Sequence, residues 1–375
     1  MILVLTQCFP PDVGGIQILI YGLAKSALDN GHGVKVMADA YKGGREFDAS
    51  SGIPTVRYGG LKPIRRFLKG RAARQAILEQ RPRAVFCDSW KSLEYLDPPP
   101  GTPVVVLAHG TEFPKAPAQS KVARMRRTFA KATAVVAASR FAADLARPYL
   151  ADSACVRIVN PPISPLPKAS QHEVAALRQR YGGGPILAGL ARLEPRKGFD
   201  RVIEALPDLA QRHPGVAFLI GGDGEDKARL QRLAADLGVA DRVHLVGRVY
   251  GKDKTALLSA ADIFTMPTRR HGSSVEGFGI VYAEAAWCGV PSLAGTYSGA
   301  VDFVDDNVTG RLVDGEGPIS SILVDMLSDR DGLVAMGKAA RAKALASGMW
   351  ETGFNKFMDA ARGRHPVLVA GGIGE

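Results

Sequence analysis

The stretch Asn160-Pro161-Pro162-Ile163-Ser164-Pro165-Leu166-Pro167 divides the chain into two halves with the same kind of sequence pattern. Four of its eight residues are proline, which has no backbone N–H donor and a fixed φ, so neither a helix nor a strand is expected there. The stretch is therefore predicted to be a linker between two domains. A length of 375 residues points the same way, because it exceeds what one hydrophobic core usually supports.

On both sides of this linker, short apolar or β-branched runs alternate with helical patterns. Before the linker, strands are expected at residues 2–6, 34–38, 84–87, 104–108, 134–137 and 156–159, with helices at 15–30, 65–80 and 140–150. After the linker, strands are expected at residues 185–190, 216–220, 243–246, 263–266 and 291–294, with helices at 198–212 and 226–237. Such alternation predicts α/β domains with parallel, doubly wound sheets, here residues 1–163 and 164–350. A ligand-binding cleft is expected between them, as in periplasmic binding proteins and two-domain dehydrogenases, so local motifs must decide the function.

The composition is that of a soluble globular protein, with 46% hydrophobic and 23% charged residues. Its cysteines (Cys8, Cys87, Cys155 and Cys288) lie far apart, without metal-ligand spacing, and are expected to be reduced thiols. The first apolar run is too short for a signal peptide, and no later run reaches the ~20 residues of a spanning helix. We therefore expect a cytoplasmic protein.

The formal net charge of +11 is concentrated in residues 62–83, where Glu79 is the only acid, and in residues 115–140, which contain no acid. Such segments suit an anionic partner, and they predict peripheral docking on the inner face of the cytoplasmic membrane. The cations expected at the membrane or acceptor are Arg65, Arg66, Arg126 and Arg127, with Ile64, Phe67, Leu68, Met125 and Phe129 as interleaved apolar residues. The alternative is a solvated basic face.

The stretch Glu276-Gly277-Phe278-Gly279-Ile280-Val281-Tyr282-Ala283-Glu284 places two glutamates eight residues apart around a glycine-rich turn. Glu276 is expected on the loop before a helix, where it can accept hydrogen bonds from sugar hydroxyls, and Glu284 two turns further, where it can bind ribose hydroxyls. The free N–H groups of residues 277–280 would face a phosphate. Two unrelated glutamates are the alternative, but the apolar run 283–291 favours a buried, committed carboxylate.

Three further motifs follow expected strands. Arg192 and Lys197 lie after the strand at 185–190, where two cations would neutralise a diphosphate leaving group. Gly14 and Gly15 follow the first strand and allow a phosphate or sugar ring to approach the backbone. His109 ends the strand at 104–108 and could bond a sugar hydroxyl.

Together these residues resemble glycosyltransferase family 4, a retaining family with the two-domain GT-B fold. The resemblance covers nearly the whole chain and includes Ala138-Ser139-Arg140 at a helix start, the interdomain Asn160-Pro161, and Trp350, where the chain crosses back so that a last helix (351–375) packs on the first domain. Within the family, the motifs are most similar to mannosyltransferases that act on phosphatidylinositol mannosides.

The resemblance implies a nucleotide-sugar donor, with GDP-mannose slightly preferred over a UDP-sugar, and a lipid-linked or polysaccharide-precursor acceptor. For the site it implies contacts of Glu276 and His109 with the donor sugar, of Glu284 with the ribose, and of Arg192 and Lys197 with the diphosphate. The loop at Gly247 and Arg248 would lie near the base. Metal-independent front-face transfer without a cofactor is expected; no DxD pair ends an expected strand, and Asp305-Asp306 is expected to be structural.

Other classes fit the sequence less well. A dehydrogenase would need G-x-G-x-x-G with a distant acid, whereas Gly221-Gly222-Asp223-Gly224 offers neither. A nucleic-acid-binding protein would need aromatic residues among its basic ones, but aromatics make up only 7%. A GT-B sugar phosphorylase, a nucleotide-sugar epimerase and a glycosyltransferase with a small soluble acceptor remain alternatives.

Overall fold

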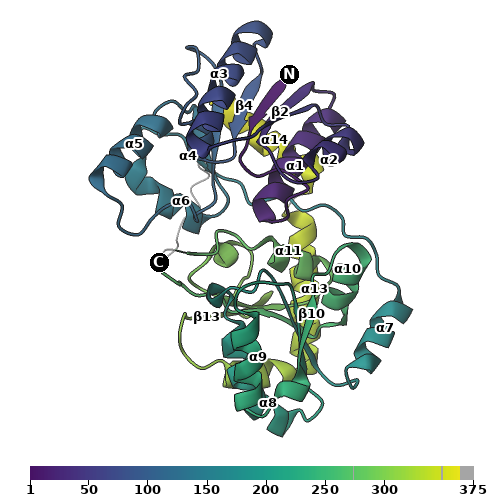
Figure 1. Cartoon of the computed structure of the whole chain (residues 1–375). Helices are drawn as coiled ribbons and strands as arrows, with labels where there is room; N and C mark the ends of the chain where they lie inside the picture. Colours follow the sequence, from purple (N-terminus) through teal and green to yellow (C-terminus); the bar gives the residue numbers. More distant parts are fainter. Residues whose placement is uncertain (273, 348, 364–375) are drawn as a thin grey trace, which may run out of the picture.

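The computed structural model describes residues 1–272, 274–347 and 349–363. Two lobes, each built on a parallel sheet, follow one another along the chain (Figure 1). The seven-stranded sheet of the first lobe has the order β3-β2-β1-β4-β5-β6-β7, and the six-stranded sheet of the second has the order β10-β9-β8-β11-β12-β13. Both orders reverse direction beside the first strand of the lobe, as in doubly wound folds.

The elements of the first lobe are β1 (Ile2–Leu5), α1 (Gly15–Asp29), β2 (Val34–Asp39), α2 (Gly44–Ser51), β3 (Thr55–Tyr58), α3 (Lys62–Gln80), β4 (Ala84–Cys87), α4 (Trp90–Leu93), β5 (Val104–Ala108), α5 (Gln119–Phe129), β6 (Ala134–Ala137), α6 (Arg140–Ala146), η1 (Arg147–Tyr149) and β7 (Val156–Ile158). The side chains of β1 alternate between two separate cores. Ile2 and Val4 pack with α1, whereas Leu3 and Leu5 pack on the other face of the sheet. Helices therefore cover both faces, which explains why the buried strands are apolar throughout.

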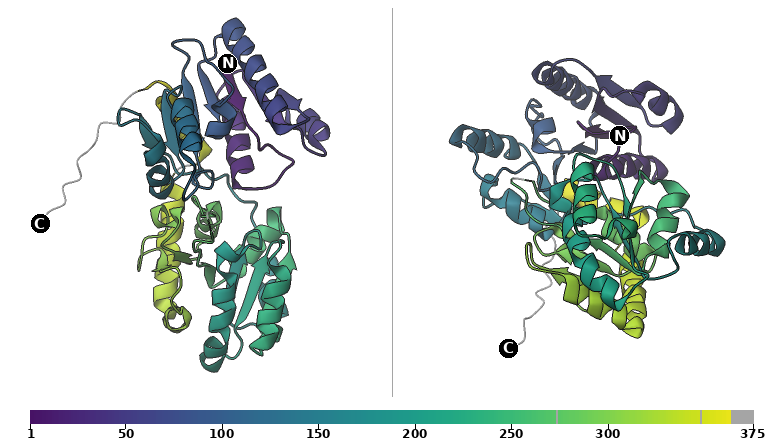
Figure 2. Two further views of the ribbon diagram at one scale, coloured as in Figure 1. Left: turned by 60° about the vertical axis from the view of Figure 1, so that its left-hand side comes forward. Right: turned by 60° about the horizontal axis from the view of Figure 1, so that its bottom comes forward.

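The elements of the second lobe are α7 (Gln171–Arg180), β8 (Ile186–Leu190), η2 (Pro195–Lys197), α8 (Phe199–Arg212), β9 (Ala217–Gly221), α9 (Lys227–Asp236), η3 (Ala240–Arg242), β10 (Val243–Gly247), α10 (Gly251–Ala260), β11 (Ile263–Met266), α11 (Ile280–Trp287), β12 (Ser292–Gly295), η4 (Gly299–Asp302), β13 (Gly310–Val313), α12 (Ser320–Ser328) and α13 (Arg330–Ala346). One continuous core joins these helices to the sheet. The lobe repeats the α/β layering of the first, as the two views of Figure 2 show.

The chain crosses between the lobes twice. After α13 it returns to the first lobe as α14 (Trp350–Ala361), whose Phe354 and Phe357 are buried against α1 and the sheet. The returning segment passes beside the linker, where Ile163 and Met349 form a parallel bridge. The expected return of the last helix is thus confirmed for residues 350–361, and residues 364–375 of the expected helix lie outside the described part.

The fold confirms the predicted class, but two strands were not expected. β3 and β13 each form an outer edge of their sheet. Thr55 to Tyr58 are not fully buried and β13 contains Arg311, so neither segment has the apolar run that indicates a central strand. Within the described residues, none of the helices combines the length and apolar character that crossing a bilayer requires.

Candidate active site

Glu276 lies on the loop between β11 and α11, and two cations from another loop hold its carboxylate. Lys197 Nζ donates to Glu276 Oε2, and Arg196 Nη1 donates to the same oxygen at 2.8 Å. Burial by itself would raise the pKa of Glu276, but the charges of Lys197 and Arg196 outweigh it, so the pKa lies below its usual range. Glu276 is therefore an ionised acceptor at neutral pH.

The cations come from the turn that follows β8, where η2 ends at Gly198 in the left-handed region. Arg192 lies nearer the strand, and its side chain is 67% exposed. Glu194 accepts from Arg192 Nη1 at 3.1 Å and from Arg196 Nε at 2.7 Å. The turn therefore carries alternating charges that lead to Glu276, with Arg192 as the most exposed cation among them.

Residues 277–280 turn sharply between the two lobes. Gly277 packs so closely on the first lobe that a Cβ there would overlap the carbonyl oxygen of His109. Gly279 has φ 76° and caps α11, which begins at Ile280, so Glu276 and Glu284 do not share a helix face. Glu276 thus lies on the loop before the helix, as expected, and Glu284 lies within the helix.

Glu284 is buried in α11, as the apolar run predicted. Lys254 Nζ, from α10, donates to its Oε1 at 2.5 Å. The sequence analysis missed Lys254, as it missed Arg196, because the partner of a buried carboxylate can lie anywhere along the chain. Each glutamate is thus paired with cations from another element: Arg196 and Lys197 for Glu276, and Lys254 for Glu284.

His109 follows β5 on the first lobe. Its ring Nε2 lies 2.9 Å from the carbonyl oxygen of Asp88, which can only accept, so Nε2 carries a proton, and Nδ1 is the acceptor when the ring is neutral. The backbone N–H of His109 donates to Glu112 Oε1 at 2.8 Å. Burial raises the pKa of Glu112, whose other oxygen has no partner among the described residues.

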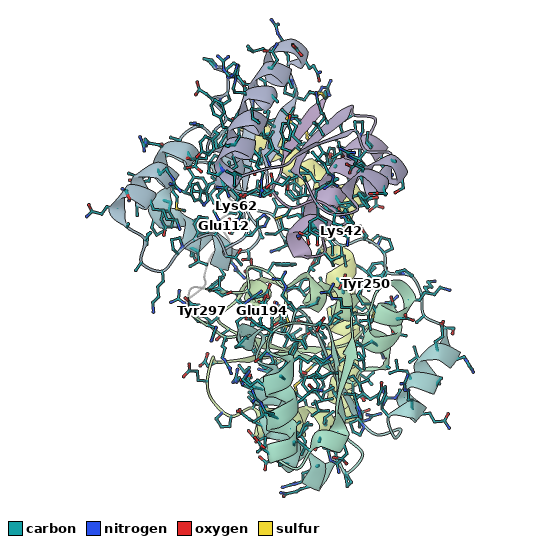
Figure 3. All side chains as sticks on the ribbon, viewed as in Figure 1. Lys42, Lys62, Glu112, Glu194, Tyr250 and Tyr297 are labelled. Carbon is teal, nitrogen blue, oxygen red and sulfur yellow. The ribbon has the colours of Figure 1, made fainter. Side chains whose placement is uncertain are left out.

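The remaining predicted residues lie on loops at the ends of strands. Gly14 caps α1 and Gly15 is its first residue, whereas Gly247 ends the edge strand β10 with φ 77° and Arg248 is exposed beyond it. Figure 3 labels residues that border the facing edges of the lobes: Lys42, Lys62 and Glu112 on the first, and Glu194, Tyr250 and Tyr297 on the second. The structure therefore brings His109, Gly277, Glu276 and Lys197 together, with Arg192 reached through Glu194.

The structure corrects the expected basic face. Arg65 Nε donates to Asp39 at 2.8 Å and Arg66 Nη2 donates to Gln7 at 2.6 Å, so both point into the lobe. The expectation that Met125 and Phe129 belong to an exposed apolar face is wrong, because both are buried in the first-lobe core. Arg126 and Arg127 of α5 are exposed.

No three His, Cys, Asp or Glu side chains gather at metal-ligand positions in the described ranges. Asp305 and Asp306 bond Thr309, Leu312 and Lys343, in a polar turn before β13.

Each lobe matches a model of a known protein family. Residues 13–165 match the model "Glycosyltransferase Family 4", and residues 174–343 match "Glycosyl transferases group 1". A GDP-mannose-dependent alpha-(1-6)-phosphatidylinositol monomannoside mannosyltransferase of Mycolicibacterium smegmatis is 33% identical over 98% of this chain and 100% of its own. A D-inositol 3-phosphate glycosyltransferase of Salinispora arenicola is 33% identical over 54% and 48% of the two chains. Among solved structures, Anabaena Alr3699/HepE in complex with UDP superposes with a TM-score of 0.80 at 21% identity, covering 97% of this chain and 100% of that one.

The two doubly wound lobes, together with the glycosyltransferase models that match both of them, identify a glycosyltransferase of the two-domain GT-B type. The full-length relationship then fixes the family: the chain belongs to glycosyltransferase family 4.

Proposed function

We propose that this enzyme transfers mannose from GDP-mannose, with retention of configuration and without a metal ion, to a phosphate-bearing lipid-linked or saccharide acceptor. The observation that carries the proposal is Glu276, held ionised by Arg196 and Lys197 at the point where Gly277 packs on His109. The full-length relative named above is a GDP-mannose-dependent mannosyltransferase, which favours this donor. A UDP-sugar is the second candidate, because the structural neighbour binds UDP.

The proposed roles follow from the positions of the charges. Arg192 and Lys197 would neutralise the diphosphate as the bond between the sugar C1 and the phosphate oxygen breaks. The acceptor hydroxyl would attack C1 from the same side, and its proton would pass to the departing phosphate. Glu276 and the unprotonated Nδ1 of His109 would accept hydrogen bonds from the sugar hydroxyls, and Glu284 would bind the ribose.

A donor assay tests these roles. Wild-type enzyme in EDTA is incubated with GDP-mannose, GDP-glucose or UDP-glucose, and Glu276→Gln and Glu284→Gln are compared by calorimetry with GDP and with the intact donor. We expect transfer from GDP-mannose in chelator, a loss of GDP binding in Glu284→Gln, and normal GDP binding with poor transfer in Glu276→Gln. Equal binding of both ligands by both variants would contradict the division of roles, and dependence on added metal would contradict metal-free transfer.

A group of cations in the first lobe supports an anionic acceptor. Burial and the neighbouring charges of Arg66, Lys121 and Lys62 lower the pKa of Lys91, and the charge of Glu112 acts on it in the opposite sense. These four cations come from α3, α4 and α5, so the fold brings together charges that repel one another. A bound phosphate would relieve this repulsion. We expect Lys91→Met to raise KM for a phosphorylated acceptor while leaving KM for the donor unchanged; equal effects on both would count against this acceptor site.

The exposed side of α3 supports docking on an anionic membrane. Leu61, Ile64, Phe67 and Leu68 expose 72%, 55%, 49% and 49% of their surface. Lys62, Arg71 and Arg74 are exposed on the same helix. Apolar side chains flanked by cations suit the interface of a bilayer that contains acidic lipids. In the proposed membrane contact, the exposed residues of this helix take the place of Arg65, Arg66, Met125 and Phe129, which were expected there from the sequence.

Vesicle flotation tests the docking. We expect binding to vesicles with acidic lipid, loss of binding at high salt, and loss in the variant Ile64→Ser/Phe67→Ser/Leu68→Ser. Val334→Ser/Leu345→Ser, on the exposed side of α13, is the matched control and should bind as the wild type does. Failure of the wild-type enzyme to float at low salt would indicate a water-soluble acceptor instead.

A further inference from the structure

Asp302 lies in η4, on the second lobe, with its side chain only 5% exposed. Its carboxylate is bonded mainly by groups of the first lobe. Oδ2 accepts from the backbone N–H of Arg140 at 2.6 Å, and Oδ1 accepts from Arg140 Nε at 2.8 Å. Asn160 Nδ2 lies 3.4 Å from Oδ2 and also donates to the carbonyl of Ala138. Asp302 therefore joins the start of α6 and the linker to the second lobe.

The segment that carries Asp302 also touches the loop of Glu276. The N–H of Gly299 donates to the carbonyl of Glu276 at 3.0 Å, and a Cβ on Gly299 would overlap the carbonyl oxygen of Gly277. That oxygen accepts from Ser139 Oγ at 2.6 Å, and Ser139 also caps α6. The loop of Glu276 is thus enclosed by η4 on one side and by the first lobe on the other.

An aromatic contact lies on the same side of the molecule. Phe141, in α6, meets Tyr297 edge-to-face at 5.1 Å, and Arg270 lies over the ring of Tyr297 at 4.7 Å. Three kinds of contact thus link α6 to the second lobe: an ion pair, a hydroxyl–carbonyl bond and an aromatic pair. Of these, the ion pair places a buried carboxylate against donors that it would lose if the lobes separated, which is costly for a buried charge.

We propose that Asp302 is a positioning residue for sugar transfer, because it fixes the loop of Glu276 against His109 by holding the start of α6. The inference rests on the proposed roles of Glu276 and His109. Glu276 and Lys197 belong to the second lobe and His109 to the first, so their alignment depends on contacts across the lobes. GDP, by contrast, would bind mainly to the second lobe. Loss of the Asp302 contacts should therefore impair transfer without impairing nucleotide binding.

A double-mutant cycle tests this. Asp302→Asn keeps the size of the side chain but turns one acceptor oxygen into an N–H donor that faces an N–H of Arg140. Because a misplacement of about 1 Å can cost ~100-fold in rate, we expect kcat to fall about 10- to 100-fold. Asp302 lies outside the proposed nucleotide site, and distant sites that share no partners influence one another by only a few tenths of a kcal/mol. The Kd for GDP should therefore stay within about twofold. Arg140→Ala, which leaves the backbone N–H in place, should lower kcat less, and the double variant should be no worse than Asp302→Asn alone.

Asp305→Asn is the matched control, because Asp305 is half exposed and pairs with Lys343 inside the second lobe. Hydrogen exchange gives a readout apart from catalysis: amides of residues 277–279 should exchange faster in Asp302→Asn, whereas those of α12 should not. Unchanged kcat, additive effects in the double variant, or weaker GDP binding in proportion to kcat/KM would each overturn the proposal. Failure of the proposed function would instead show as absent transfer in the wild-type enzyme or as normal transfer in Glu276→Gln.

Discussion

Arg196 bridges two carboxylates, Glu194 and Glu276, and its side chain is largely buried. Replacing Arg196 by Gln leaves Lys197 alone to hold Glu276 and removes a charged hydrogen bond worth about 1.5–3 kcal/mol. We expect kcat/KM for the sugar donor to fall by one to two orders of magnitude, with Arg196→Lys partly restoring it. Steady-state kinetics with Arg212→Gln, on the exposed end of α8, as control will check this. An Arg196→Gln enzyme as active as the wild type would show that Lys197 is sufficient.

Glu112 gives the first lobe a pH-dependent stability. Its pKa is higher in the folded protein than in the unfolded chain, because burial disfavours the charged form. As pH rises above the usual carboxyl range, the unfolded chain loses this proton first, so the folded state loses stability until the folded pKa is passed. Glu112→Gln removes this loss and keeps the acceptor for the N–H of His109.

Urea unfolding at several pH values measures the effect. We expect the free energy of unfolding of Glu112→Gln, relative to the wild type, to increase between pH 4.5 and neutral pH, with the exposed Glu46→Gln as control. A difference that stays constant with pH would show that Glu112 ionises in the folded protein as it does in the unfolded chain.

Whether a site residue could be singled out from the sequence depended on whether it belongs to a short local motif. Glu276, Glu284, Arg192 and Lys197 belong to short local motifs, so they could be singled out from the sequence, and their roles stay predictions. Arg196, Lys254 and Asp302 act through partners 80, 30 and 162 residues away, and no local spacing indicates such pairs. Arg65 was misjudged for the same reason, because its partner Asp39 lies on another element.

Among the elements, α14 completes the core of the lobe that it does not follow in sequence. Phe357 is 1% exposed and stacks on Trp350 at 6.1 Å between ring centres. Phe357→Ala should cost about 3–5 kcal/mol, because it leaves a cavity in this core. Tryptophan fluorescence during urea unfolding will measure it, with the exposed Phe67→Ala expected to change the free energy of unfolding by less than about 0.5 kcal/mol. A small effect of Phe357→Ala would mean that α14 only covers the core.

The central strands and the edge strands β7 and β10 were predicted, whereas the edge strands β3 and β13 were not. β4, β5, β6 and β11 were predicted with the observed bounds because both faces of each are buried. The exposed side of α3 could not be predicted from charge alone. Its true outward face is set by Lys69, which is buried against Asp39 and so fixes how the helix is turned.

For the whole molecule, nucleotide binding should raise thermal stability, because the unfolded chain has no donor site. At a ligand concentration of about 100 times Kd, the free energy of unfolding rises by about 2.7 kcal/mol. We expect GDP to shift the melting temperature more than UDP at equal concentration, and Glu284→Gln to abolish most of the shift. A larger shift with UDP would reassign the base of the donor.

The paired crossing at Ile163 and Met349 has a mechanical consequence. A single tether would let one lobe swivel about it freely, whereas two chain segments running side by side resist torsion and still permit bending. We therefore expect the lobes to move relative to one another mainly by rocking about one axis. A single protease nick in either segment would leave the two lobes attached through the other segment.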